Sequence, residues 1–93
     1  MVVLRGFYEG LEIPVDNEWF VIGRGRTADA ILAEPTISRA HAAIGWASDE
    51  GFFVEDLGST NGTLVNGKKR DRRVLRDGDE IQIGKLRLRF AKP

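Results

Sequence analysis

The 93-residue chain contains no cysteine and a single histidine, His41. Without cysteine it forms no disulfide, iron–sulfur cluster or thiolate zinc site, and one histidine argues against any other zinc centre. No apolar run approaches the ~18 residues that cross a bilayer. Arg5 interrupts the apolar opening of the chain, so we also expect no signal peptide. The sequence therefore predicts a domain without metal, cofactor or membrane anchor.

The chain also lacks net charge, because 14 basic side chains balance 14 acidic ones. Attraction of the whole molecule to nucleic acid or to an anionic membrane is therefore not expected. The balance hides an asymmetry: residues 1–63 hold four cations and ten anions, a charge of −6, and residues 64–93 hold ten cations and four anions, a charge of +6. Six cations lie in the nine residues 68–76 alone.

Helical periodicity is missing as well, since apolar residues do not recur at the 3.6-residue spacing over any helix-length stretch. The hydrophobic content of 42% and charged content of 30% are typical of a folded domain. Short alternating runs, separated by Gly, Asn and Asp, predict strands instead. In 86–90, for example, leucine and phenylalanine alternate with arginine. The candidate strands are Val2–Gly6, Leu11–Val15, Trp19–Gly23, Ala30–Leu32, Ala40–Trp46, Phe52–Asp56, Thr63–Val65, Arg73–Leu75, Asp79–Ile83 and Leu86–Phe90.

These short strands predict an all-β sandwich or barrel formed by one domain over residues 1–93. The chain ends three residues after the last predicted strand, which is typical of a module taken from a longer protein. Four aromatic side chains on predicted strands are expected in the core: Trp19, Trp46, Phe52 and Phe53.

Two segments, Gly23–Arg39 and Leu57–Gly62, do not follow the strand pattern. Long irregular connections on a rigid β scaffold commonly carry binding sites. Arg24 brings a planar, permanently charged guanidinium that suits carboxylate or phosphate. The stretch around it lacks the spacing of a dinucleotide fingerprint, and no P-loop occurs in the chain.

Ser38 and His41 could suggest a nucleophile with its base. Positions three apart on a strand point to opposite faces, and no second histidine is available as a general base, so we expect no enzyme. A loop that presents Ser38 and Arg39, with His41 held beneath them, fits the residues better. Asn61 tolerates a left-handed backbone, and its amide can donate to an acceptor or brace a neighbouring loop.

Five blocks occur in a familiar order and spacing: Gly23-Arg24, Ser38–Ala42, Asp56–Thr63, Asn66-Gly67 and Leu75–Gly84. Over roughly residues 19 to 90 the sequence resembles the forkhead-associated (FHA) domain, a phosphothreonine-binding module. The resemblance implies a two-sheet β-sandwich of about eleven short, mostly antiparallel strands. It also implies binding loops at one end.

The resemblance implies roles for individual residues. Arg24, Ser38 and Arg39 would contact the phosphate, and Thr60 and Asn61 would hold the peptide, Asn61 through its backbone. A phosphate carries a charge near −2 and three acceptor oxygens, which arginines, a hydroxyl and loop N–H groups can satisfy. In the family, residues near Gly84-Lys85 often select the side chain three positions after the phosphothreonine. The residues expected to support the binding loops are Gly23, His41, Gly62, Asn66 and Gly67.

The implied function is non-enzymatic recognition of a phosphothreonine-containing protein, in Ser/Thr-kinase signalling or regulated assembly. A Ser/Thr kinase would act upstream, and the isolated domain would be monomeric and cytoplasmic, or nuclear in a eukaryote. One alternative is an FHA-like structural or oligomerisation domain that binds partners without phosphate. This alternative is disfavoured because a structural domain needs no converging cations, whereas the chain has all four of Arg24, Ser38, Arg39 and Asn61.

A second alternative is contact with nucleic acid or an acidic partner through the basic stretch 68–76. This stretch contains no aromatic residue on which single-stranded bases could stack, so nucleic acid is not the expected partner. Charged residues of this kind also protect a sheet edge from pairing with another molecule. The FHA family usually has an aliphatic residue soon after the Asn-Gly pair, whereas here the first inward position is predicted at Val74.

Overall fold

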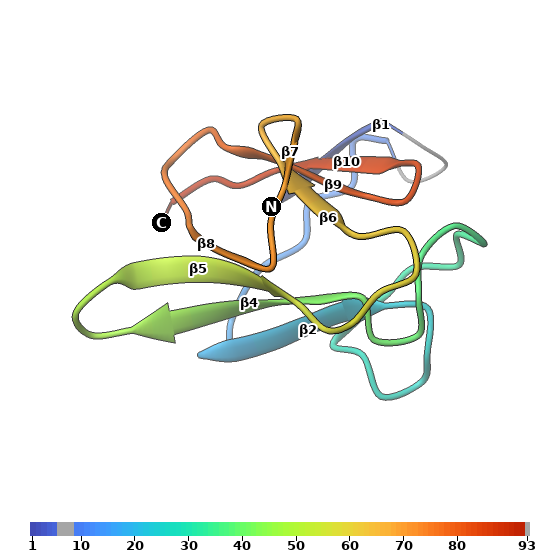
Figure 1. Ribbon diagram of the computed structural model, residues 1–93, viewed down its shortest axis with the longest axis horizontal. Helices are drawn as coiled ribbons and strands as arrows, with labels where there is room; N and C mark the ends of the chain where they lie inside the picture. Colours follow the sequence, from blue (N-terminus) through green and yellow to red (C-terminus); the bar gives the residue numbers. More distant parts are fainter. Residues whose placement is uncertain (6–8, 93) are drawn as a thin grey trace.

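The computed structural model describes residues 1–5 and 9–92, and in this part the chain forms two five-stranded sheets (Figure 1). The strand order is β1-β10-β9-β6-β7 in one sheet and β3-β2-β4-β5-β8 in the other. The predicted all-β sandwich is confirmed. The strands are β1 (Val2–Arg5), β2 (Trp19–Gly23), β3 (Ala30–Ile31), β4 (Ala42–Ala47), β5 (Gly51–Asp56), β6 (Thr63–Val65), β7 (Lys68–Lys69), β8 (Arg72–Val74), β9 (Glu80–Ile83) and β10 (Leu86–Arg89).

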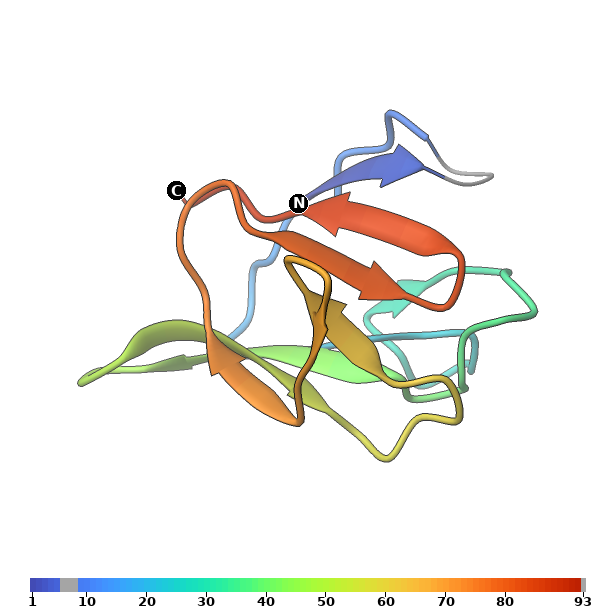
Figure 2. The same cartoon turned by 45° about the horizontal axis from the view of Figure 1, so that its top comes forward.

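The core lies between the two sheets, which Figure 2 shows as separate layers. As the alternation predicts, Leu86 and Leu88 of β10 are fully buried while Arg87 and Arg89 are exposed. Each sheet therefore has one apolar face, and burial of these faces against each other holds the layers together. The other sheet contributes Phe20, Ile22, Ile44 and Val54 to this core. No helix in the described part of the chain is long and apolar enough to cross a membrane.

One strand pair decides where the segments after β2 and β3 lie. Among the described pairs, only β2 and β3 run parallel, with Ile22 opposite Ala30 and Gly23 opposite Ile31. Two parallel strands end at the same edge of their sheet. The segments that follow β2 and β3 therefore both leave the sandwich at the same end.

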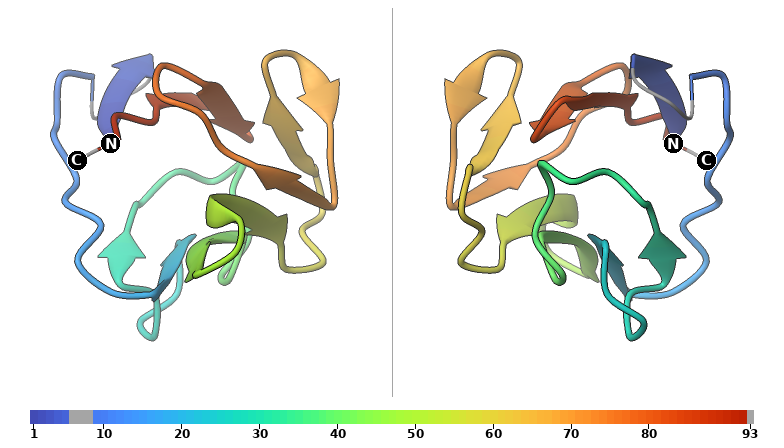
Figure 3. Two further views of the ribbon diagram at one scale, coloured as in Figure 1. Left: turned by 90° about the vertical axis from the view of Figure 1, so that its left-hand side faces the viewer. Right: turned by 90° about the vertical axis from the view of Figure 1, so that its right-hand side faces the viewer.

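The basic stretch runs along one side of the sandwich and joins the two sheets, as Figure 3 shows in orange. Lys68–Lys69 forms β7, the edge of one sheet, and Arg72–Val74 forms β8, the edge of the other. The sequence does not predict β7, because lysine has little preference for strands. The turn Asn66-Gly67 places Lys68–Lys69 beside β6. Both turn residues have positive φ (50° and 84°), which closes a tight two-residue hairpin.

Two expectations about the strands are wrong. Leu11–Val15 forms no strand; Pro14 offers no N–H for a ladder, and the pairing there is limited to exchange of hydrogen bonds between Met1 and Ile13. Val74 is 38% exposed, and Leu75 is the buried residue instead. Val74 pairs with Phe53 on the outer face of its sheet, which turns it away from the core.

The expectation that both tryptophans lie in the core is also wrong, since Trp19 is 46% and Trp46 is 42% exposed. Trp19 pairs with Gly45 on the outer face of the sheet, where its ring centroid lies 6.3 Å from that of Phe53. Phe53 is buried, although it lies on this outer face, because Arg72 covers its ring at 4.0 Å. Trp46 pairs with the half-buried Phe52 near the β4–β5 turn, at the end of the sandwich.

Candidate functional site

Three connecting segments, 24–29, 33–41 and 57–62, gather at the end of the sandwich that the right-hand view of Figure 3 faces. Backbone hydrogen bonds join them. The N–H of Arg24 donates to the carbonyl of Ser38 at 3.1 Å, and the N–H of Leu57 donates to the carbonyl of His41 at 2.9 Å. Residues far apart in the sequence therefore form one continuous surface at this end.

Glycine is required at position 23, which the sequence assigns to a turn, because the backbone of Arg39 lies very close to it. A Cβ placed on Gly23 would overlap the carbonyl oxygen of Arg39. The next glycine, Gly25, donates its N–H to this same carbonyl at 3.0 Å. Glycine at position 23 thus lets the segment that carries Arg39 lie directly against the end of β2.

Three arginines meet in a surface pocket lined by Arg24, Gly25, Arg26, Thr27 and Arg39. Nε of Arg24 donates to the carbonyl of Ile37 at 3.1 Å, which orients the guanidinium. No carboxylate is among the lining residues. Sequence reasoning identified Arg24 and Arg39 but missed Arg26, whose only signal is its place in the same loop.

Ser38, Thr60 and Asn61 are brought together across two of the loops. The N–H of Thr60 donates to Oγ of Ser38 at 3.0 Å, and Nδ2 of Asn61 donates to the carbonyl of Thr36 at 2.7 Å. The N–H of Lys85 donates to Oγ1 of Thr36 at 2.8 Å, so the β9–β10 turn also joins this cluster. Sequence reasoning did not identify Thr36, because nothing in the sequence distinguishes it from another loop threonine.

His41 is fully buried and links the same two loops from beneath. The N–H of Ser38 donates to its Nδ1 at 3.0 Å, so Nε2 carries the ring hydrogen and donates to the carbonyl of Gly62 at 2.8 Å. The hydroxyl of Ser38 is bound by Thr60 rather than by His41. Among the described contacts, no hydrogen bond joins the hydroxyl of Ser38 to the ring of His41.

Asp56 fixes the turn that leads into the third loop. Its carboxylate accepts hydrogen bonds from the N–H groups of Gly58 and Ser59, each at 3.0 Å, and from the hydroxyls of Ser59 and Thr63. Burial by itself would raise the pKa of Asp56, but these hydrogen bonds outweigh it and hold the pKa below its ordinary value. The ionised carboxylate thus stabilises this loop.

Lowering the pH should reverse this effect. Because the pKa of Asp56 is depressed in the folded state, its contribution is present above the ordinary carboxyl pKa, about 4, and is lost as the pH falls through the folded value. We expect Asp56→Asn to be less stable than wild type by about 1 kcal/mol at neutral pH, with the difference shrinking as the pH falls below the ordinary carboxyl pKa and through the lower folded value. Urea unfolding at several pH values measures it. A difference that does not change with pH would contradict this prediction.

Asn66 and Gly67 are not part of the loop cluster. They turn the β6–β7 hairpin, and Nδ2 of Asn66 donates to Oδ1 of Asp79 at 2.9 Å. The N–H of Glu80 donates back to Oδ1 of Asn66 at 3.0 Å, which ties the hairpin turn to β9. Their geometry is that of structural residues within the sheet.

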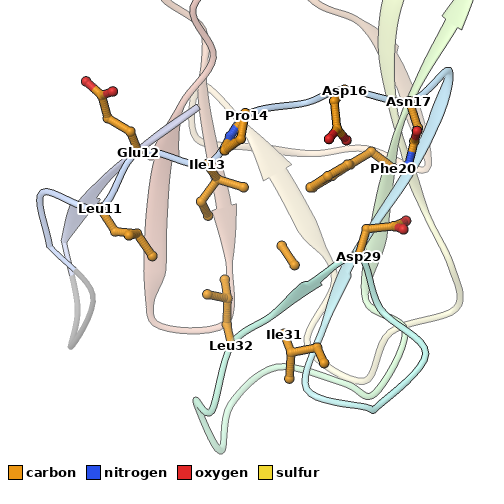
Figure 4. Close-up of a pocket in the computed structure, with 11 residues that line it drawn as sticks. Leu11, Glu12, Ile13, Pro14, Asp16, Asn17, Phe20, Asp29, Ile31 and Leu32 are labelled. Carbon is orange, nitrogen blue, oxygen red and sulfur yellow. The ribbon is translucent and has the colours of Figure 1, made fainter.

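Figure 4 shows a second pocket, between residues 11–17 and the strands β2 and β3. Its centre is apolar, while Glu12, Asp16 and Asp29 are the charged residues that line it. Carboxylates repel a phosphate, so this pocket does not suit one. The full lining is Leu11, Glu12, Ile13, Pro14, Asp16, Asn17, Phe20, Asp29, Ala30, Ile31 and Leu32.

The family model of the FHA domain matches residues 20–84. The chain belongs to the FHA family. This FHA domain is 43% identical over 92 residues to the oxoglutarate dehydrogenase inhibitor of Corynebacterium diphtheriae, covering 99% of the chain and 64% of that protein. It is also 43% identical over 90 residues to the glycogen accumulation regulator GarA of Mycobacterium tuberculosis, covering 97% of the chain and 55% of GarA. The chain therefore spans less than two thirds of these curated relatives.

A solved structure from a study of phosphothreonine-dependent FHA domain interactions has the same fold. It superposes with a TM-score of 0.83 at 29% identity, covering 99% of this chain and 93% of that one. The predicted FHA family is therefore confirmed. The three arginines of the pocket and the segments 24–29, 33–41 and 57–62 lie within the matched residues.

Proposed function

We propose that this FHA domain binds the phosphothreonine of a partner protein at the pocket formed by Arg24, Arg26 and Arg39. The observation that carries the proposal is the meeting of three arginines in one pocket without a lining carboxylate. Ser38 borders this group, since its carbonyl binds the N–H of Arg24. In this proposal Arg24, Arg39 and the Ser38 hydroxyl donate charge-assisted hydrogen bonds to the phosphate oxygens.

Thr60 and Asn61 are proposed to hold the peptide on either side of the phosphothreonine. One N–H of the Asn61 side-chain amide is bound to the carbonyl of Thr36, which fixes the position of residue 61, and the backbone of Asn61 is proposed to contact the ligand. Because these loops are fixed to one another before binding, little conformational entropy is lost when a peptide arrives. Gly23, His41 and Gly62 act in this proposal as supports of the loops rather than as contacts.

The proposed role is regulation by binding, without catalysis. The relatives are named as an inhibitor and as a regulator, which supports a similar role here. A Ser/Thr kinase would create the ligand by phosphorylating the partner, and the domain would act as a monomer in the cytoplasm. The proposed phosphate site offers donors but no general base, which fits recognition rather than turnover.

Phosphothreonine should bind more tightly than phosphoserine. One extra methyl in a fitted pocket contributes about 1–3 kcal/mol, which corresponds to roughly 10- to 200-fold in affinity. Isothermal titration of matched phosphothreonine, phosphoserine and unphosphorylated peptides, chosen from a degenerate phosphothreonine library, measures the difference. The unphosphorylated peptide should show no binding. Equal affinity for all three peptides would overturn the proposed function.

A further inference from the structure

The basic stretch touches the peptide-binding loop directly, through Lys69. A Cβ placed on Gly62 would lie 2.7 Å from Cε of Lys69 and 3.4 Å from its Cδ, so the lysine stem covers the space that a side chain would fill. Gly62 is also the residue whose carbonyl binds His41. The ammonium of Lys69, one bond beyond Cε, therefore lies at the loop that is proposed to hold the peptide.

Strand pairing fixes this position. Lys69 lies opposite Leu64 in the β6–β7 hairpin, and the N–H of Arg70 donates to the carbonyl of Thr63 at 2.9 Å. Arg70 thus follows Lys69 beside the first residue of β6, next to Gly62. Protection of a sheet edge explains cations on β7 and β8 in general. It does not explain why a lysine stem packs on a glycine of the binding loop.

The cations of this stretch differ in what they bind. Arg72 is engaged: it pairs with Glu50 at 2.8 Å and covers the ring of Phe53. Arg73 and Arg76 form no ion pair in the described residues, but their charge is directed at Asp79. Burial would raise the pKa of Asp79, and hydrogen bonds from Asn66 and the Arg76 N–H, together with the charges of Arg73 and Arg76, lower it.

The remaining cations are Lys68, Lys69 and Arg70, which are exposed and form no ion pair within the part of the chain that the structure describes. Asp71 is the only carboxylate of the stretch. Positive charge is therefore available at the end of the stretch that reaches the binding loop.

We propose that the domain selects phosphothreonine segments with acidic residues beside the phosphothreonine, and that Lys69 and Arg70 bind these carboxylates. This inference rests on the proposed function. A protein ligand is favoured over nucleic acid because the whole chain has no net charge and the available cations are few and without interleaved aromatics. The acidic residues would lie on the side of the peptide that passes over Gly62.

The test compares phosphothreonine peptides with a common core and three kinds of flank: acidic before the phosphothreonine, acidic after it, or neutral. Titration calorimetry measures the affinity of each peptide for three proteins. These are the wild type, the double variant Lys69→Met/Arg70→Gln and, as the matched control, Arg89→Gln. Methionine keeps a stem on Gly62 and removes the charge. Arg89 is an exposed cation on β10, outside the binding loops.

We expect one acidic flank to raise the affinity of the wild type about threefold to tenfold over the neutral flank. The double variant should lose this advantage and Arg89→Gln should keep it. Added salt should reduce it in the wild type, a result that does not depend on the folding of any variant.

The outcomes separate the two proposals. If the neutral phosphopeptide binds and neither acidic flank improves its affinity, this inference is wrong while the proposed function stands. If no phosphopeptide binds, the proposed function fails, and the inference fails with it. A labelled DNA duplex is titrated in parallel. Duplex binding that depends on Lys69 and Arg70, without a gain from acidic flanks, would overturn the inference in favour of a nucleic-acid contact.

Discussion

Replacement of Arg24 with alanine is expected to weaken phosphothreonine-peptide binding by about 2–4 kcal/mol, roughly 30- to 800-fold. Each hydrogen bond from a guanidinium to a phosphate contributes about 1.5–3 kcal/mol, and arginine can form two of them at once. Nε of Arg24 is held by the carbonyl of Ile37, so the guanidinium is positioned before the ligand arrives. The variant loses both the charge and this orientation.

Two further variants make the Arg24 experiment specific. Arg24→Lys keeps the charge without the planar fork, and its affinity should fall between those of wild type and Arg24→Ala. Arg89→Ala removes an exposed cation from the outer face of β10 and should bind like the wild type. Titration calorimetry gives the affinities, and thermal unfolding verifies that each variant is folded. An Arg24→Ala domain with wild-type affinity would remove Arg24 from the phosphate site.

Replacement of His41 with alanine is expected to cost about 3–5 kcal/mol of unfolding free energy, a large part of the stability of an ordinary domain. The fully buried ring binds at both nitrogens, to the N–H of Ser38 and to the carbonyl of Gly62. Alanine leaves a cavity and two polar groups without partners, and each such group costs about 1–3 kcal/mol. Urea unfolding measures the loss.

The effect of His41 on binding can be separated from its effect on folding. His41→Gln retains a group that accepts and one that donates, so it should lose less stability than His41→Ala. Both variants should bind phosphopeptide more weakly even where they are folded, because the loops of Ser38 and Gly62 are no longer joined. A His41→Ala domain as stable as the wild type would show that the ring does not hold these loops together.

Much of the sandwich could be predicted because alternation reports which face of a strand is buried, as in Leu86–Arg89. The errors have a common physical origin. Hydrophobicity indicates that Trp19 prefers burial. Its pairing with Gly45 places it on the outer face of the sheet instead, and this pairing depends on the arrangement of the whole sheet. Lys68–Lys69 becomes a strand because a tight turn places it beside β6, against its own preference.

The sequence could single out residues of the candidate site where chemistry distinguishes a residue type, as for Arg24 and His41. The contacts of Thr36 and Lys69 with this region are ones that residue type does not reveal. Thr36 acts through its carbonyl, bound by an amide 25 residues later, and Lys69 acts through the contact of its stem with Gly62. Both contacts depend on where the folded loops come to lie. Arg26 is a different case. It lies two residues after Arg24 in the same loop, so the sequence alone was sufficient to include it among the candidate cations.

The parallel pairing of β2 with β3 has a practical consequence for the use of the domain as a reagent. It directs the segments after both strands to one end, whereas the β4–β5 turn lies at the opposite end of the sandwich (Figure 1). A fluorophore, surface tether or fusion partner attached at Ser48 or Asp49, both exposed in that turn, lies at the end opposite the proposed binding site. We therefore expect a label at this position not to obstruct peptide binding at the proposed site.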